Sequence, residues 1–222
     1  MEPLGDTALV LDFGDRVDRA ISARVMAARD AVAAAGLEGI VDLVPTFCSL
    51  AVHFAPEQIG SADLAARIGM LELAEAAAGR PGQAVRIPVL YDGPDLGAVA
   101  QAAGLSPDEV AKLHAATPYH VYMLGFLPGF AYLGDLPESL RLPRLKEPRT
   151  RVPPGSVALA EQMTAVYPVQ SPGGWHLIGR TPLILFDHRK DSPSLLQPGD
   201  EVRFEAIGEA EFERLSSDGE LS

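Results

Sequence analysis

The sequence has only one cysteine, Cys48, in 222 residues. One cysteine excludes an internal disulfide and any zinc or iron–sulfur site built from several cysteines. Because Cys48 lies in an apolar run, we interpret it as a small buried hydrophobe rather than a nucleophile. Long apolar runs are absent, and so is a basic segment followed by an apolar one at the start. We therefore expect no transmembrane helix, no secretory signal and a cytoplasmic location.

Positive charge is also scarce. The chain has 18 Lys and Arg against 30 Asp and Glu, which gives a formal net charge of −12. An acidic surface repels phosphate backbones and anionic lipids, so we expect neither a nucleic-acid partner nor a membrane partner. Hydrophobic residues make up 47% of the chain, which is enough for a sizeable core in one large domain or two small ones.

Several common catalytic signatures are missing. The sequence has no Gly-x4-Gly-Lys-Ser/Thr run and no Gly-x-Gly-x-x-Gly run, so P-loop and Rossmann nucleotide sites have no support. It has no His-Glu-x-x-His run, and its five histidines are scattered, so we expect no metal site. Ser156 follows a glycine but lacks the second glycine of a nucleophile elbow.

The first 90 residues predict a small α/β domain. Four apolar runs have the length and composition of strands: residues 8–13, 40–44, 49–54 and 85–91. Apolar residues recur at helical spacing from Val17 to Val32, and again in a segment that starts after Ser61, as N-cap, and ends near residues 79–82. The order βαββαβ predicts a split-βαβ, ferredoxin-like domain over residues 1–85, with both helices on one face of an antiparallel sheet.

Two short helical pieces are expected next, between residues 94 and 116. In the second, Ser106 as N-cap, Pro107 and Glu109 form a capping box with a favoured proline at the first helical position. The acidic tail after Gly208 predicts a further short helix.

Proline and glycine dominate the region between these helices. From Pro118 to Pro182 the chain has 10 prolines and 7 glycines, which separate short apolar and aromatic runs. Such spacing is typical of short strands joined by shaped loops. We expect a β-barrel or sandwich here, with residues 178–186 and 202–207 as its last strands.

A local basic cluster departs from the acidic balance of the chain. Five basic residues face a single acid, Glu147; they are Arg141, Arg144, Lys146, Arg149 and Arg151. Such a cluster is either a solvated loop or a site for an anionic group, and the sequence leaves both interpretations open. Guanidinium groups bind carboxylate or phosphate through a bidentate fork, which favours the second.

Glycine-rich loops with aromatic residues flank this cluster. Residues 125–134 combine glycines with three aromatic side chains, and a Gly173-Gly174 pair precedes Trp175. Glycines allow backbone amides to approach an oxyanion closely. The alternative is structural: the glycines set turn geometry, and the aromatic residues fill the core.

These loops resemble a known family. The resemblance rests on five runs: residues 122–134, 148–157, 167–175, 177–182 and 198–200. They are similar to the family that includes the B-type component of 5-oxoprolinase, the KipI-type kinase inhibitors and allophanate hydrolase subunit 1. The resemblance implies an α+β protein with a small N-terminal α/β domain at residues 1–85 and a cyclophilin-like β-barrel at residues 86–222.

The same resemblance implies one component of an ATP-dependent 5-oxoprolinase complex, which hydrolyses the lactam of 5-oxoproline to glutamate. The implied partners are a C-type component of related fold and an A-type component. ATP with Mg²⁺ is the implied cosubstrate, shared with the partner, and the chain is expected to be inactive alone. Two alternatives remain: a KipI-type inhibitor of a sensor histidine kinase, and a carboxyltransferase half, as in allophanate hydrolase subunit 1, acting on urea or a similar amide.

Candidate site residues follow from the resemblance together with the charge chemistry above. The catalytic candidates are Arg149, Arg180 and Thr164. The substrate-binding candidates are Phe126, Phe130, Arg151, Tyr167, Ser171, Gly173, Gly174 and Trp175.

One loop departs from the family pattern. In relatives this loop resembles Ala-Gly-x-Gln-Thr-Gly-x-Tyr-Pro, whereas residues 160–168 of this chain are Ala-Glu-Gln-Met-Thr-Ala-Val-Tyr-Pro. Both glycines are replaced, and Met163 takes the glutamine position, with Gln162 one place away. If this loop supplies an amide to the substrate, the departure alters the activity.

Overall fold

The computed structural model describes residues 1–71 and 82–219. The chain forms two compact units, Met1–Pro81 and Gly82–Ser222. Each unit has its own hydrophobic cluster. The expected tail of the second helix, from residue 72 to its end near residues 79–82, lies largely outside the described residues. Within the described residues, no helix is long and apolar enough to cross a membrane.

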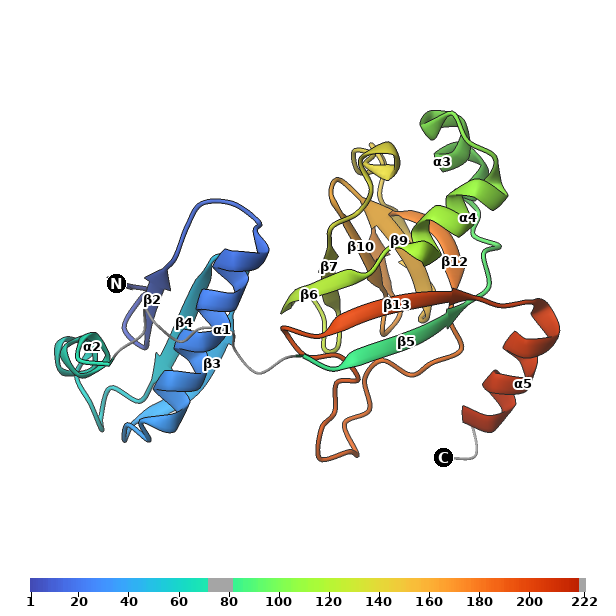
Figure 1. The fold of residues 1–222 in the computed structure, drawn as a ribbon. Helices are drawn as coiled ribbons and strands as arrows, with labels where there is room; N and C mark the ends of the chain where they lie inside the picture. Colours follow the sequence, from blue (N-terminus) through green and yellow to red (C-terminus); the bar gives the residue numbers. More distant parts are fainter. Residues whose placement is uncertain (72–81, 220–222) are drawn as a thin grey trace. The chain divides into compact units, whose positions relative to one another are not determined.

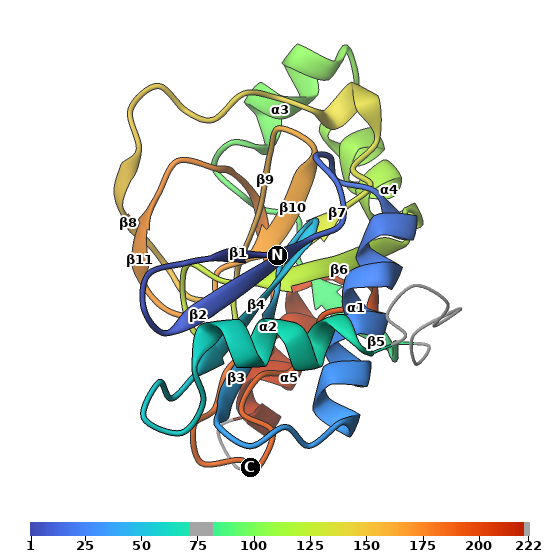
Figure 2. The ribbon, with the colours of Figure 1, turned by 90° about the vertical axis from the view of Figure 1, so that its left-hand side faces the viewer.

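The first unit is an antiparallel four-stranded sheet with two helices packed on one face (Figures 1 and 2). Its strand order is β1-β2-β4-β3, with bounds β1 Glu2–Pro3, β2 Ala8–Asp12, β3 Ile40–Pro45 and β4 Ser49–Phe54. Alternate residues of β2 and β4 point to the same cluster as both helices; they are Leu9, Leu11, Leu50, Val52 and Phe54. The half-buried Cys48 packs against this cluster, as its apolar setting predicts.

The two helices begin at different kinds of cap. Helix α1 (Arg19–Ala34) starts after Asp18, whose carboxylate accepts hydrogen bonds from the next backbone amides. Helix α2 (Ser61–Gly69) starts after Gly60, which makes no side-chain cap hydrogen bond. The expected cap was therefore wrong by one position, because Ser61 already lies in the first turn of the helix.

The fourth expected strand of this unit belongs to the other sheet. Strand β5 (Ala84–Val89) pairs in parallel with β13 (Glu201–Ala206) over its whole length. It buries Ile87 and Val89 in the core of the second unit, and β1 occupies the edge of the first sheet beside β2. The ferredoxin-like arrangement is therefore not confirmed. The strand spans the boundary expected at residue 85, and its pairing puts all of it in the second unit.

The second unit is built on a seven-stranded sheet with the order β12-β9-β10-β7-β6-β13-β5. The remaining strands of this sheet are β6 Tyr119–Leu124, β7 Ala131–Gly134, β9 Ser156–Ala160, β10 Met163–Val166 and β12 His176–Arg180. Leu90, just after β5, exchanges two backbone hydrogen bonds of 2.9 Å with Arg180 at the end of β12. This bridge nearly closes the sheet into a barrel, as Figure 1 shows. The cyclophilin-like assignment of the barrel stays a prediction.

Short elements surround the barrel. They are a two-stranded ribbon of β8 (Arg149–Val152) and β11 (Ser171–Gly173), the helices α3 (Leu96–Ala103), α4 (Pro107–Ala116) and α5 (Glu209–Gly219), and a 3₁₀ turn at Glu138–Leu140. The capping box at the start of α4 is confirmed: the Ser106 amide donates to Glu109 at 2.7 Å, and the Glu109 amide donates to the Ser106 hydroxyl at 3.3 Å. Helix α5 confirms the expected tail helix.

The strand expected at residues 178–186 is shorter in the structure. Strand β12 ends at Arg180, and the chain leaves the sheet through Thr181 and Pro182. Proline has no amide hydrogen to donate to a sheet ladder, which accounts for the early end.

Candidate functional site

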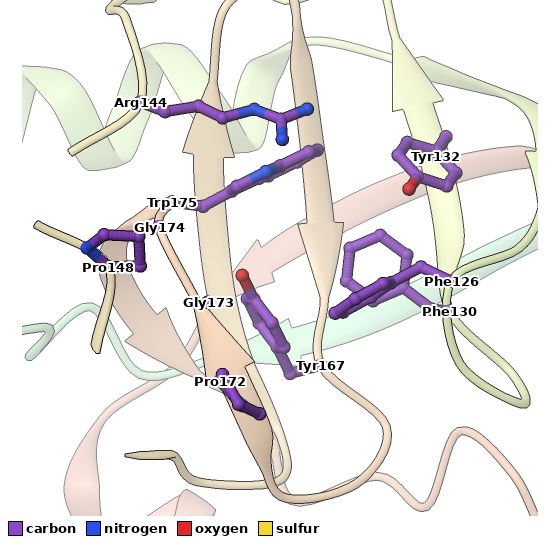
Figure 3. Close-up of a pocket in the computed structure, with 10 residues that line it drawn as sticks. All are labelled: Phe126, Phe130, Tyr132, Arg144, Pro148, Tyr167, Pro172, Gly173, Gly174 and Trp175. Carbon is purple, nitrogen blue, oxygen red and sulfur yellow. The ribbon is translucent and has the colours of Figure 1, made fainter. Parts of the chain in front are cut away.

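Six of the predicted site residues meet in one cavity of about 320 Å³ in the second unit, which we call the aromatic cavity (Figure 3). Its walls come from the loop between β6 and β7, the start of β7, the loop before β8, the end of β10 and the segment around β11. The lining residues are Phe126, Phe130, Tyr132, Arg144, Pro148, Tyr167, Pro172, Gly173, Gly174 and Trp175. A volume of this size is at the small end of the range for ligand pockets, roughly 300–1,000 Å³.

Phe130 is the centre of the aromatic wall. Its ring lies edge-to-face with four neighbours, at centroid distances of 5.5 Å to Phe126, 5.1 Å to Tyr132, 5.3 Å to Tyr167 and 5.8 Å to Trp175. Edge-to-face pairs are the favoured aromatic geometry, and each contributes about 0.5–1.5 kcal/mol beyond burial. Phe130 is only 2% exposed, so this ring sets the positions of the other four.

Phe126 lies at the rim of the cavity in a constrained loop. Its backbone has φ +67°, an unusual value for a bulky side chain, and its side chain is 63% exposed. A tight set of backbone hydrogen bonds closes the loop, including one of 3.1 Å from the Gly125 amide to the Phe130 carbonyl. Backbone strain of this kind concentrates at functional sites, and here it accompanies an exposed aromatic side chain at the rim of a cavity.

Tyr167 brings a hydroxyl group to the aromatic cavity. Burial raises its pKa above the usual value, although a hydrogen bond with the Trp175 backbone and the charges of Arg144 and Arg149 oppose that shift. The phenol therefore keeps its proton at neutral pH and can donate a hydrogen bond. A β-carbon on Gly173 would collide with the phenolic oxygen, so only glycine permits this packing. Figure 3 shows the hydroxyl between Gly173 and Trp175.

Arg144 is the one cationic residue that lines the aromatic cavity. Its guanidinium lies over the Trp175 ring, 6.0 Å from the ring centroid (Figure 3), and its Nε is 3.5 Å from a carboxylate oxygen of Glu161. Both side chains of this ion pair are largely exposed, so the pair is weak and the guanidinium can exchange Glu161 for a ligand carboxylate. Together with Tyr167, Arg144 gives an apolar cavity two polar donors.

Three predicted arginines lie in a second cavity of about 340 Å³, which we call the three-arginine cavity. Its lining residues are Asp92, Gly93, Pro94, Arg149, Arg151, Pro153, Pro154, Ser156, Leu177, Gly179 and Arg180. No aromatic residue lines it, in contrast to the aromatic cavity. The structure therefore divides nine of the eleven predicted residues between an apolar cavity and a cationic one.

Carboxylates from the segment after β5 anchor two of these arginines. The Arg149 Nη2 donates to Asp95 Oδ1 at 2.6 Å, and the other oxygen of Asp95 accepts from the Leu177 amide at 2.7 Å. The Arg180 Nε donates to Asp92 at 2.8 Å, and its guanidinium lies 4.3 Å from the centroid of Phe212 in α5. These contacts fix the direction of each guanidinium before any ligand arrives.

The remaining two predicted residues lie in neither cavity. Thr164 is fully buried, donates to the Ala158 carbonyl at 2.9 Å, and lies 2.9 Å from His114 Nε2. Its single proton is used, so it accepts from His114, and the other ring nitrogen accepts from the Tyr91 hydroxyl at 2.8 Å. Burial lowers the pKa of His114 to about 3, so the ring is neutral. Ser171 is 6% exposed on β11.

Sequence reasoning missed three kinds of site residue. Tyr132 and Arg144 line the aromatic cavity: Tyr132 stands in the 125–134 run without an assigned role, and Arg144 belongs to the basic cluster but was not among the substrate-binding candidates. Asp92 and Asp95 orient the arginines from more than 50 residues away in the chain, and no local pattern marks them. Among the residues that the structure describes, no group of three or more His, Cys, Asp or Glu could hold a metal ion.

Comparisons with known proteins place this chain in a family. The family described as carboxyltransferase domain, subdomain C and D, matches residues 1–196. The chain is 38% identical to the 5-oxoprolinase B subunit of Bacillus subtilis over 226 residues, which cover 96% of the chain and 94% of that protein. The chain belongs to the carboxyltransferase-domain family that includes the 5-oxoprolinase B subunit. The resemblance that the sequence motifs indicate is thereby confirmed.

A second curated relative and two solved structures are also similar to this chain. The 5-oxoprolinase B subunit of Escherichia coli O157:H7 is 41% identical over 204 residues, covering 90% of the chain and 93% of that protein. The crystal structure of TTHA0988 superposes with a TM-score of 0.82 at 38% identity. The chain covers 90% of its own length in that comparison but spans only 40% of the TTHA0988 chain. The Kluyveromyces lactis urea amidolyase shares the fold, with a TM-score of 0.74 at 20% identity over 15% of that chain.

The loop that departs from the family pattern forms the β9–β10 hairpin. Glu161 has φ +54° at the position where the family pattern has glycine. The hairpin therefore keeps a glycine-type conformation despite the substitution. Met163 is 7% exposed and lines neither cavity, and Ala165 is fully buried. The family's glutamine position therefore lies behind the cavity walls in this chain.

Proposed function

We propose that the chain is the B-type component of an ATP-dependent 5-oxoprolinase, which opens the lactam of 5-oxoproline to glutamate. The observation that carries the proposal is the aromatic cavity, where aromatic rings surround one guanidinium and one protonated phenol. 5-Oxoproline is a small ring with one amide oxygen and one carboxylate, and the cavity offers a matching partner for each. Support also comes from the two 5-oxoprolinase B subunits at 38% and 41% identity.

Six residues of the aromatic cavity have a role in this proposal. The rings of Phe130 and Trp175 form part of the apolar wall that contacts the lactam ring and excludes water. Arg144 binds the substrate carboxylate, for which the guanidinium fork is well suited. Tyr167 donates its hydroxyl proton to the lactam oxygen, and the amides of Gly173 and Gly174 lie in the same wall. Thr164 and Ser171 act as positioning residues behind this wall.

The proposed reaction uses ATP because amide resonance makes direct attack by water slow. ATP supplies a phosphoryl group to the lactam oxygen, which turns that oxygen into a leaving group. Water then adds to the ring carbon, and the carbon–nitrogen bond breaks as the nitrogen takes up a proton, which leaves an acyl phosphate. A second water attacks this acyl phosphate, and phosphate leaves from the new carboxylate of glutamate. Arg149 and Arg180 are the proposed catalytic cations, since both hold positive charge in the three-arginine cavity. With no acidic cluster in the described residues, Mg²⁺ would enter with the phosphates.

The proposal includes partner components of the C and A types and a cytoplasmic location. The test is co-expression with the neighbouring components, purification of the complex, and an ATP-dependent assay of glutamate formation from 5-oxoproline. Arg144→Gln should raise KM for 5-oxoproline, whereas Arg86→Gln, which removes an exposed charge on β5, should leave KM unchanged. A folded complex without glutamate formation would overturn the proposal.

A second candidate is a carboxyltransferase half acting on urea or a similar amide. The match to the carboxyltransferase domain, subdomain C and D, favours it. The same aromatic cavity would then hold a planar amide without a carboxylate, and Arg144 would have no ligand group to bind. Transfer of a carboxyl group from carboxybiotin to urea by the complex, unaffected by Arg144→Gln, would support this candidate over the first.

A further inference from the structure

We propose that the three-arginine cavity is a phosphate-binding site, separate from the ligand of the aromatic cavity. The inference deepens the proposed function, because an ATP-dependent reaction needs a place for phosphate groups beside the lactam. The binding test below requires neither partner proteins nor turnover, so its failure is distinguishable from failure of the proposed activity.

The charge balance of the cavity favours an anionic ligand. Arg149, Arg151 and Arg180 all line it, and Asp92 is the one acid among the lining residues. Asp95 lies just outside and pairs with Arg149, so three positive groups meet two negative ones. Within a chain of net charge −12, this is a local positive site. An anion is attracted here, whereas the rest of the acidic chain repels it.

Each guanidinium keeps donors that the protein does not use. Arg149 is held through Nη2, while its Nη1 is buried and has no acceptor among the described residues. Arg180 is held through Nε alone. Arg151 is exposed and makes no ion pair within residues 1–71 and 82–219. A buried donor without an acceptor costs stability, and a ligand oxygen removes that cost.

The backbone explains why the three arginines converge. Arg149 and Arg151 are two residues apart on β8, and alternate residues of a strand point to the same side. Arg180 ends β12, whose backbone is bonded to Leu90 at the barrel closure. The cavity wall between these strands is stiff, since Pro94, Pro153 and Pro154 form part of it. The site is therefore largely formed in the free chain.

The chemistry of the lining selects phosphate over an apolar ligand. The cavity has no aromatic surface on which a ring could stack, and its cations are all arginine, whose planar fork binds phosphate through two parallel hydrogen bonds. The aromatic cavity has the opposite composition, with five aromatic rings and one arginine. The two cavities thus divide the binding of phosphate and of the apolar ring between them.

The cavities are neighbours across the β8–β11 ribbon. Pro148 lines the aromatic cavity, and the next residue, Arg149, lines the three-arginine cavity. Gly173 of β11 pairs with Arg149 of β8 and faces the aromatic cavity. The two cavities therefore share the β8–β11 ribbon as a common wall.

The test measures binding of inorganic pyrophosphate to the purified chain by calorimetry, with glutamate as the carboxylate probe. Arg151→Gln should weaken pyrophosphate binding about ten-fold, and Arg86→Gln, with the same change in charge on β5, should leave it unchanged. Asp92→Asn should tighten binding several-fold, because it removes a negative charge and frees Arg180. A disrupted fold would weaken binding instead, so this variant separates the two causes.

Three results would overturn the inference. They are no pyrophosphate binding by the wild-type chain, equal losses in Arg151→Gln and Arg86→Gln, or glutamate binding that is tighter than pyrophosphate binding and is lost in Arg151→Gln. The last would assign the site to a carboxylate.

Discussion

The phenolic oxygen of Tyr167 packs directly on the α-carbon of Gly173, and this contact forms the floor of the aromatic cavity. Gly174, the next residue, has room for a β-carbon, which would lie in ordinary van der Waals contact with Pro148 at 3.6 Å. The two adjacent glycines therefore differ in whether a β-carbon fits at their position. The difference provides a matched pair of substitutions.

Gly173→Ala should destabilise the protein by about 1–3 kcal/mol, because the new methyl group must displace Tyr167. Gly174→Ala should change stability by less than about 1 kcal/mol, since its site has room. Urea unfolding followed by tryptophan fluorescence measures both, and Trp175 is the sole tryptophan. Equal destabilisation by the two substitutions would mean that Tyr167 does not pack as described.

Tyr167→Phe should lower kcat of the complex about 10- to 100-fold, because the variant loses the donor to the lactam oxygen. Burial raises the pKa of Tyr167, so the wild-type phenol stays protonated and the ratio of the two rates should be constant between pH 6 and 9. Tyr122→Phe is the control, since the Tyr122 hydroxyl donates to Asp135 away from both cavities. A ratio that changes across this pH range would contradict a neutral phenol.

Local patterns predicted most elements because the information for them is local. The apolar period of α1 and the capping box of α4 each lie within one short segment, and both appear in the structure. Strand β5 was also predicted as a strand, but the strand with which it pairs could not be predicted. Its neighbour β13 lies more than 100 residues later in the chain. The apolar pattern of β5 fits either sheet, so it does not indicate which strand β5 pairs with.

The candidate site was predicted in its residue types but not in its division. Glycine, aromatic and arginine residues were chosen from loops that are close in sequence. The structure divides them because the arginines lie on β8 and at the end of β12, whereas the aromatic residues lie in the β6–β7 loop and just after β10 and β11. Thr164 illustrates the limit further: its position in the motif suggested chemistry, while its burial is fixed by His114, 50 residues away.

Glu161→Gly should raise the free energy of unfolding by about 1 kcal/mol, because Glu161 has φ +54°, which glycine adopts without strain. Glu161→Ala is the matched control, since it also removes the exposed ion pair with Arg144 but keeps a β-carbon at the strained position. Urea unfolding should show a gain for glycine only. A gain of equal size for alanine would assign the effect to the lost charge.

The buried His114 should make the stability of the protein sensitive to acid. Burial lowers its pKa to about 3 in the folded chain, against about 6.5 when unfolded. Between these values the unfolded chain binds a proton that the folded chain excludes, so stability is full above pH 6.5 and falls as pH decreases, by at most about 1.4 kcal/mol per pH unit.

His114→Gln should reduce this slope in urea unfolding measured between pH 7.5 and 4.5, although it lowers stability at every pH by disturbing the bonds to Tyr91 and Thr164. His188→Gln, at an exposed position, should keep the wild-type slope. If His114→Gln and the wild-type chain lose stability in parallel as pH falls, then His114 is not the buried neutral group that links Tyr91 to Thr164.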